Sequence, residues 1–357
     1  MSTEGTLGVQ THPELNMAAE TKSSSSRPVE SPARLDVDRL ALIRRRDHFK
    51  VLVGRFGVLI AFFCTVAVFS ALKPHEFLRY DNLRAILIAA APLAVIAVGL
   101  TVVLTMKEFD LSFSAVAGLA AAVAATLMAN DGVVWWLAVI AALLAGAAVG
   151  FVNSTIVAFA GVTSFIATLA VGTVATGVEY LISGKQTIYQ GIPTSFVKIG
   201  QGQIAGIDTP VVIAAITLVL GYVLLERSKS GRRMRAVGGN VEAARLAGVR
   251  VRRLRSLGFV IVGVAAAGTG IIMSATAATY TPSIAAGLLL PAYAAVFLGS
   301  TLAGRFSILG TGLGIIFLGI VQNGLILLGL ADAWINIVQG SILAFAVLLS
   351  RIGANGA

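Results

Sequence analysis

Chemically active side chains are few in this chain, and their types exclude several kinds of site. The chain has 357 residues, of which 57% are hydrophobic and 12% are charged, and its histidines are His12, His48 and His75. No histidine lies within a long apolar run, so the sequence predicts neither a metal centre nor a histidine-based catalytic site. A Gly-x-x-x-x-Gly-Lys-Ser/Thr loop is also missing, so this chain should not hydrolyse ATP itself. We expect no catalytic residue, no metal ligand and no cofactor here.

One polar stretch interrupts the apolar runs at a position where it can do chemistry. Residues 107–118 read KEFDLSFSAVAG and place Asp110 and Ser112 between two hydrophobic segments. Polar groups inside a bilayer are costly unless they are paired or face a solute path. Asp110 either caps the following helix at the inner membrane surface, paired with Lys107, or lies beside unwound chain at a substrate path.

Other polar residues inside apolar runs either bond between helices, their usual role, or line a path. Glu179 lies near the end of its run beside Tyr180 and either faces the outer vestibule or reaches the membrane interface. We favour the interface, because polar groups near the end of a span find water there. The candidate pathway residues are Asp110, Ser112, Ser114, Asn153, Thr168, Glu179, Gln322 and Asn323.

Long apolar segments must position these residues. The mean hydropathy is +0.89, and a membrane-spanning helix needs about twenty apolar residues. Gly146 and Gly150, and likewise Gly310 and Gly314, have the spacing that favours close helix packing. The sequence predicts an all-α polytopic membrane protein with about ten transmembrane helices. The predicted spans are residues 51–72, 84–106, 111–129, 133–160, 164–183, 210–226, 256–275, 288–304, 308–328 and 334–350.

Basic loops predict the orientation of these spans. Residues 226–256 contain ten Lys and Arg against two acidic residues, and more arginines precede the first span. Because cytoplasmic loops collect Lys and Arg, both regions and both termini should be cytoplasmic. The net charge of +10 is explained in the same way, without nucleic-acid binding. Residues 1–40 are rich in Ser and Pro and should form a disordered cytoplasmic tail, followed by a transmembrane domain over residues 41–352.

A short helix is predicted inside the basic loop 227–255. Asn240 is a good N-cap, and Glu242 lies in the first turn, where the helix dipole stabilises a carboxylate. Gly248 is a residue type at which helices commonly end. One face of the helix is formed by Ala243, Leu246 and Ala247. Local physics allows two roles, a connector whose arginines keep the loop inside or a docking helix for a cytoplasmic partner.

Residues 231–251, GRRMRAVGGNVEAARLAGVRV, resemble the cytoplasmic "EAA" loop of ABC importer permeases. They are most similar to the loop of the ribose-type monosaccharide permease family. Segments 165–178, 294–304 and 323–329 also look like this family, and the likeness covers about residues 50–352. The resemblance implies the vitamin-importer-like (type II) ABC permease fold. It also implies a coupling helix that docks on an ATPase subunit through Gly239, Asn240, Glu242, Ala243, Ala244, Arg245 and Gly248.

The same resemblance implies function and partners. The chain would form the path of an ATP-binding cassette importer that carries a monosaccharide such as ribose, xylose or galactose, or a polyol, across the cytoplasmic (inner) membrane. Its partners would be two ATPase subunits holding ATP and Mg, a second permease chain (identical or a sibling), and a periplasmic or lipid-anchored solute-binding protein. Lys107 and Glu108 stand where the family pattern has glycines. The alternative is an ion-coupled secondary transporter of a small polar solute, which normally needs more embedded acids.

Overall fold

The computed structural model describes residues 58–354, with side chains through residue 348. These residues belong to one unit of the chain, Arg46–Ala357. The predicted tail 1–40, the basic residues before the first span and the first residues of that span lie outside the described residues.

Each predicted span contains an apolar helix. Within residues 58–354, seven helices are long and apolar enough to cross a membrane and three more are shorter. Helices suit a bilayer because they satisfy their backbone polar groups internally. The prediction of a polytopic, all-helical protein is confirmed. The apolar helices are Val58–Leu72, α2 (Tyr80–Thr105), α3 (Phe113–Ala129), α4 (Trp135–Ser154), α5 (Ser164–Ser183), α7 (Thr209–Tyr222), α10 (Val251–Ala277), α11 (Leu289–Ala303), α12 (Ile308–Leu327) and α13 (Asp332–Ala354).

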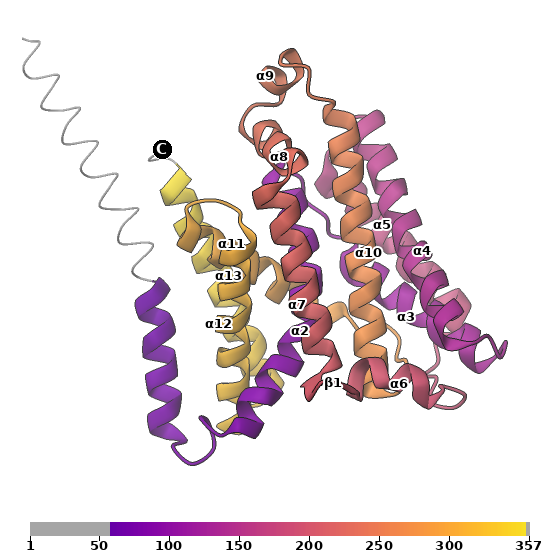
Figure 1. The fold of residues 1–357 in the computed structure, drawn as a ribbon, viewed down its shortest axis with the longest axis vertical. Coiled ribbons are helices and arrows are strands. Elements are labelled where there is room, and N and C mark those ends of the chain that lie inside the picture. Colours follow the sequence, from indigo (N-terminus) through magenta and orange to yellow (C-terminus); the bar gives the residue numbers. More distant parts are fainter. Residues whose placement is uncertain (1–57, 355–357) are drawn as a thin grey trace, which may run out of the picture. The chain divides into compact units, whose positions relative to one another are not determined.

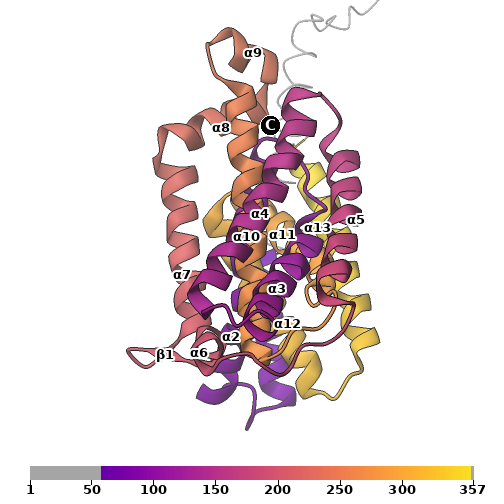
Figure 2. The same ribbon diagram turned by 90° about the vertical axis from the view of Figure 1, so that its right-hand side faces the viewer.

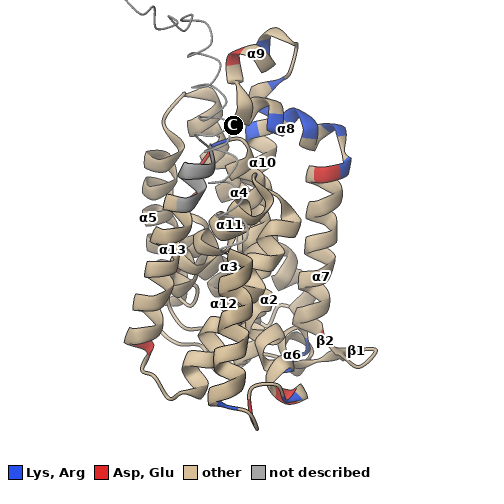
Figure 3. Ribbon diagram, turned by 90° about the vertical axis from the view of Figure 1, so that its left-hand side faces the viewer, with Lys and Arg blue, Asp and Glu red and all other residues tan. Residues whose placement is uncertain are grey.

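Short elements extend or connect these helices. Two π-helical turns, Thr155–Phe159 and Val223–Arg227, continue α4 and α7, and a 3-10 turn, Ala286–Leu288, precedes α11. At one end of the bundle lie α8 (Lys229–Gly239) and α9 (Val241–Leu246) (Figure 1). We call it the basic end, because Lys and Arg gather on α8 there (Figure 3).

The opposite end carries the only two strands among the described residues. Here α6 (Thr194–Gln201) is followed by an antiparallel hairpin of β1 (Gln203–Ile204) and β2 (Ile207–Asp208) (Figure 1). Ile204 pairs with Ile207 and Gln203 with Asp208. We call this the hairpin end.

Helix α10 packs against α2, α3 and α4, and α3, α4 and α5 lie together along one side of the bundle (Figure 2). Glycines permit the close approaches. A side-chain carbon added at Gly146 of α4 would collide with the carbonyl oxygen of Gly263 in α10. Gly310 and Gly314 of α12 lie equally close to the backbone of α11. The predicted close packing at both glycine pairs is confirmed.

Candidate functional site

The connection between α2 and α3 is not helical, yet it runs inside the bundle. Side chains from other helices satisfy its backbone donors. The amide of Phe109 donates to Ser164 Oγ at 3.1 Å, and that of Leu111 donates to Thr168 Oγ1 at 2.9 Å. Irregular backbone at membrane depth is tolerated only where protein groups or water satisfy it. We call residues 108–112 the broken segment.

The broken segment runs along α5 toward the interior. Ser164 begins α5, Thr168 follows one turn later, and a side-chain carbon added at Gly172 would lie 3.1 Å from Cα of Ser112. Eight helical residues rise about 12 Å. Helix α3 therefore begins well inside the bundle and not at its basic end.

Three polar side chains meet where the broken segment joins α3. Asp110 Oδ1 accepts hydrogen bonds from the backbone amide of Ser112 at 2.8 Å and from its Oγ at 2.6 Å. Asn153 of α4 donates from Nδ2 to Ser112 Oγ at 2.8 Å. Asp110 and Asn153 are buried, and Asn153 Oδ1 has no hydrogen-bond partner among the described residues. A buried acceptor without a partner costs free energy, so this cluster holds unused hydrogen-bonding capacity.

The predicted cap and partner of Asp110 need correction. The N-cap position of α3 is Ser112, and Asp110 lies two residues earlier, folding its carboxylate back onto the start of the helix. Lys107 is exposed and adopts a φ of 61°, a conformation in which glycine is favoured. Asp110 and Lys107, both within the described residues, form no ion pair with each other, so the interpretation of Asp110 as a surface cap paired with Lys107 is wrong.

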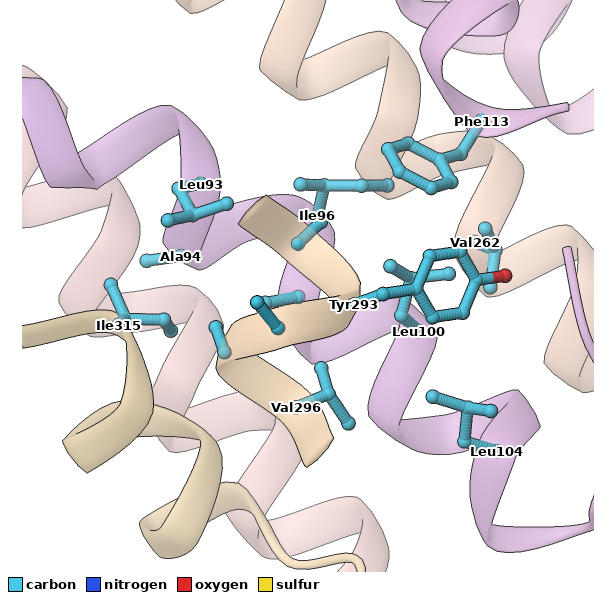
Figure 4. Close-up of a cluster of buried hydrophobic side chains, with 14 of the residues drawn as sticks. Leu93, Ala94, Ile96, Leu100, Leu104, Phe113, Val262, Tyr293, Val296 and Ile315 are labelled. Carbon is cyan, nitrogen blue, oxygen red and sulfur yellow. The ribbon is translucent and has the colours of Figure 1, made fainter. Parts of the chain in front are cut away.

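Tyr293 of α11 clamps the broken segment and is absent from the residues predicted from the sequence. Its hydroxyl donates to the carbonyl oxygen of Asp110 at 2.7 Å and accepts from the amide of the same residue at 3.1 Å. The ring lies among Leu100, Phe113 and Val262 (Figure 4). A buried tyrosine hydroxyl usually needs a hydrogen-bond partner. The position of Tyr293 within an apolar run was therefore the sequence signal that could have identified it as a polar contact inside the bundle.

Glu179 is buried, which corrects the prediction that it reaches the membrane interface. Its Oε1 accepts hydrogen bonds from Tyr280 Oη at 3.0 Å and from the amide of Ser283 at 2.7 Å. Its carboxylate packs on α3 at Gly118, where an added side-chain carbon would lie 2.7 Å from Oε2. Burial raises the pKa of Tyr280, so this phenol stays protonated and donates. Glu179 thus ties α5 to α3 and to the connection after α10.

The other candidate residues divide between helix pairing and the cluster. Asn323 exchanges hydrogen bonds with Asn82 at 2.9 and 3.0 Å, and Gln322 accepts one from Gln339 at 3.3 Å. Their predicted default role, bonding between helices, is confirmed. Ser114 is half-buried and is the second residue of α3. The structure brings Asp110, Ser112 and Asn153 together and places Thr168 on the adjacent amide of Leu111. We call these four residues the interior cluster.

The predicted short helix in the basic loop is present as α9. Asn240 is its N-cap, with Oδ1 accepting from the amide of Ala243 at 3.0 Å, and Gly248 follows with a φ of 79°. Leu246 is 89% exposed, whereas Ala244 is buried. The helix stands beyond the ends of the long helices (Figure 1) and presents its apolar face outward.

Among the described residues, no three His, Cys, Asp or Glu side chains gather in a way that could hold a metal ion. The chemical groups of the interior cluster are hydroxyls, amides and one carboxylate, which can bond a neutral polar solute.

Comparison with known proteins identifies the family. The family described as branched-chain amino acid transport system / permease component matches residues 82–347. The chain is 35% identical over 312 residues to the ribose import permease protein RbsC of Escherichia coli (strain K12), covering 86% of this chain and 97% of that protein. It is 31% identical over 319 residues to the L-arabinose ABC transporter permease protein AraH of Azospirillum brasilense, covering 88% and 93%. It is 28% identical over 307 residues to the D-allose transport system permease protein AlsC of Escherichia coli (strain K12), covering 85% and 94%.

These matches confirm the resemblance found in the sequence motifs. The type II importer fold predicted from that resemblance is the fold of this family, and its members are non-catalytic subunits. The chain belongs to the family of branched-chain amino acid transport system permease components.

Proposed function

We propose that this chain forms the path for a monosaccharide in an ATP-driven importer. Relatives at 35%, 31% and 28% identity are named for ribose, L-arabinose and D-allose, all neutral polyhydroxylated sugars. The observation that carries the proposal is the broken segment, which places polar groups deep among apolar helices. A sugar path needs hydroxyls, amides and aromatic faces more than fixed charge.

The path is proposed to run past the interior cluster. Asp110, Ser112 and Asn153 are hydrogen-bonded to one another there, Thr168 accepts from the adjacent amide of Leu111, and Ser114 is the second residue of α3. These hydrogen bonds hold the broken segment in place, and a passing sugar would replace some of them. Asn153 Oδ1, which has no hydrogen-bond partner among the described residues, is the acceptor most ready to receive a sugar hydroxyl. Glu179 is proposed to support the path by fixing α3 against α5.

The basic end is proposed to face the cytoplasm, because Lys and Arg collect there. With that orientation the termini are cytoplasmic, and residues 41–352 form the permease domain after a tail over residues 1–40. At the basic end α9 would dock on an ATPase subunit, with Leu246 at the centre of the contact and Ala244 supporting the helix from inside. The proposed docking residues are Gly239, Asn240, Glu242, Ala243, Ala244, Arg245 and Gly248.

The proposed partners follow from this arrangement. Two ATPase subunits would bind at the basic end of a permease dimer, made of two such chains or of this chain and a sibling. A solute-binding protein would deliver the sugar at the hairpin end. Because the sequence contains no phosphate-binding loop, ATP and Mg are assigned to the partner subunits.

Uptake into proteoliposomes tests the proposal. The permease is reconstituted with its ATPase and solute-binding protein, and uptake of labelled ribose, arabinose and allose is measured with ATP on the ATPase side. We expect uptake of at least one sugar that requires ATP and stops when the phosphate-binding lysine of the ATPase is replaced. Uptake by the permease alone in a proton or sodium gradient would contradict the proposal and support an ion-coupled carrier.

A further inference from the structure

A partly buried ion pair joins the broken segment to the start of α10. Glu108 Oε1 lies 2.7 Å from Arg255 Nε, and the two side chains are 9% and 24% exposed. Breaking one partner of such a pair leaves an uncompensated charge in a medium of low polarity. Removing either side chain therefore leaves the charge of the other without its partner.

On one side of the pair, α9 and the start of α10 form a single packed body with the end of α2. Ala244 of α9 shares an apolar cluster with Val251 and Leu254 of α10 and with Val102 and Met106 at the end of α2. Interiors packed in this way transmit displacement because they leave little free volume. A displacement of α9 should therefore also displace Met106.

Two glycines allow close contact within this body, one with the backbone of α2 and one with side chains at its end. A side-chain carbon added at Gly238, at the end of α8, would collide with the carbonyl oxygen of Thr105, and one at Gly258 of α10 would lie 2.5 Å from the methyl carbon of Met106. A side chain at Gly238 would require the backbone of α2 to move, and one at Gly258 would displace the Met106 side chain. Residues 105 and 106, just before the broken segment, are thus packed against both α8 and α10.

On the other side of the pair, the interior cluster begins within two residues. The amide of Phe109 is bonded to α5, and Asp110 is bonded to Tyr293 of α11 and to Ser112. Glu108 therefore lies between the packed body at the basic end and the interior cluster, and its amide donates to the carbonyl oxygen of Val103 at 3.1 Å.

Neighbouring arginines do not share this contact. Arg252 lies over the ring of Phe159 at 5.9 Å, and Arg253 is exposed. Among the described residues, Arg255 is the one base within ion-pair distance of Glu108.

We propose that the Glu108–Arg255 pair is the link that carries displacement of α9 to the broken segment. Glu108 and Arg255 are positioning residues, since neither belongs to the interior cluster or to the outer face of α9. This inference rests on the proposed function, in which α9 docks on an ATPase. When the pair is broken, ATP hydrolysis should continue while less sugar is transported for each ATP hydrolysed.

The test measures sugar transported per ATP hydrolysed in proteoliposomes containing permease, ATPase and solute-binding protein. The variants are Glu108→Gln, Arg255→Gln, the conservative Arg255→Lys, and the exchange Glu108→Arg with Arg255→Glu. Arg253→Gln is the matched control, since it removes an equal charge two residues away. The amount of assembled complex is measured for each variant.

We expect Glu108→Gln and Arg255→Gln to lower the sugar-to-ATP ratio about tenfold while hydrolysis continues, as a coupling free energy of ordinary size implies. Arg255→Lys should keep an intermediate ratio, the exchange variant should recover to within about threefold of the native value, and Arg253→Gln should match the native ratio. If the single variants fail to assemble, the sugar-to-ATP ratio of the exchange variant is compared with the native ratio, and a ratio within about threefold of it supports the inference.

Two results would overturn the inference. The first is a native ratio in both Gln variants, whether uptake and hydrolysis are unchanged or fall in proportion. The second is an exchange variant that assembles but gains nothing over the single changes. Failure of the proposed function is distinguishable, because the native complex itself would then take up no sugar with ATP.

Discussion

The hydroxyl of Tyr293 bonds both backbone polar groups of Asp110, the carbonyl oxygen at 2.7 Å and the amide at 3.1 Å. One side chain of α11 thereby replaces the hydrogen bonds that a helix would have given this residue. The broken segment keeps its non-helical course because such substitutes exist, and its polar groups remain inside the bundle.

Tyr293→Phe should loosen the broken segment. The change leaves the buried amide and carbonyl of Asp110 unsatisfied, at a cost of about 1–3 kcal/mol. Thermal unfolding of the purified protein in detergent should shift downward, and sugar uptake should fall. Tyr180→Phe is the matched control, since its half-buried hydroxyl makes one side-chain bond, to Ser283 at 3.0 Å, and its loss should be smaller. An equal effect of the two changes would contradict the clamp.

Gly118→Ala should destabilise the packing around Glu179. The added carbon would lie 2.7 and 2.8 Å from the two carboxylate oxygens, and overpacking of this kind costs about 1–3 kcal/mol. The control is Gly177→Ala in α5, where no heavy atom lies within 4 Å of the added carbon. This control should be neutral or gain about 0.5–1 kcal/mol. Equal melting temperatures for the two variants would show that Glu179 does not occupy this site.

Leu246→Asp should weaken binding of the ATPase without harming the fold. Leu246 is 89% exposed, so its replacement should change the free energy of unfolding by no more than about 0.5 kcal/mol. Loss of an anchor at the centre of an interface should weaken association about tenfold or more, measured by co-purification and by titration in detergent. Ile204→Asp makes a similar change on the hairpin and should leave binding intact. Unchanged association in Leu246→Asp would remove α9 from the docking surface.

The contact between Asp208 and Arg84 should give the hairpin end a defined dependence on pH. Asp208 Oδ1 lies 2.6 Å from Arg84 Nη2, and this hydrogen bond lowers the pKa of Asp208 below its ordinary value. A lowered pKa gives stability that is present above the unfolded pKa and lost as the pH falls through the folded pKa. The melting temperature of native protein should therefore exceed that of Asp208→Asn by a constant amount from pH 5 to 8, and the difference should shrink below about pH 4. A difference that shrinks between pH 8 and 6 would exclude this contact as its source.

The sequence predicts the helices and α9 well because their signals are local. Apolar runs define the spans, and Asn240 caps α9 through a bond to a residue only three positions away. The glycine pairs were predictable because close packing requires small residues at helical spacing.

Contacts between distant residues could not be predicted in this way. Glu179 is buried by Tyr280, 101 residues later, and Asp110 is held by Tyr293, 183 residues later. Because Glu179 lies near the end of an apolar run, the sequence predicts that its carboxylate reaches water. In the folded chain the connection after α10 and Gly118 of α3 cover the carboxylate instead. The non-helical course of residues 108–112 likewise depends on partners from four other helices, α4, α5, α10 and α11.

If the broken segment lines the path of the transported sugar, position 112 should be accessible to a polar thiol reagent. The single native cysteine, Cys64, is replaced by serine, and Ser112→Cys is introduced into the assembled transporter. We expect the thiol at position 112 to be modified during ATP-driven turnover. Its modification should be slower at saturating sugar than without sugar, because bound sugar would cover the position. The opposite result is a thiol at position 112 that stays unmodified in every state, while one introduced by Ile204→Cys on the exposed hairpin reacts.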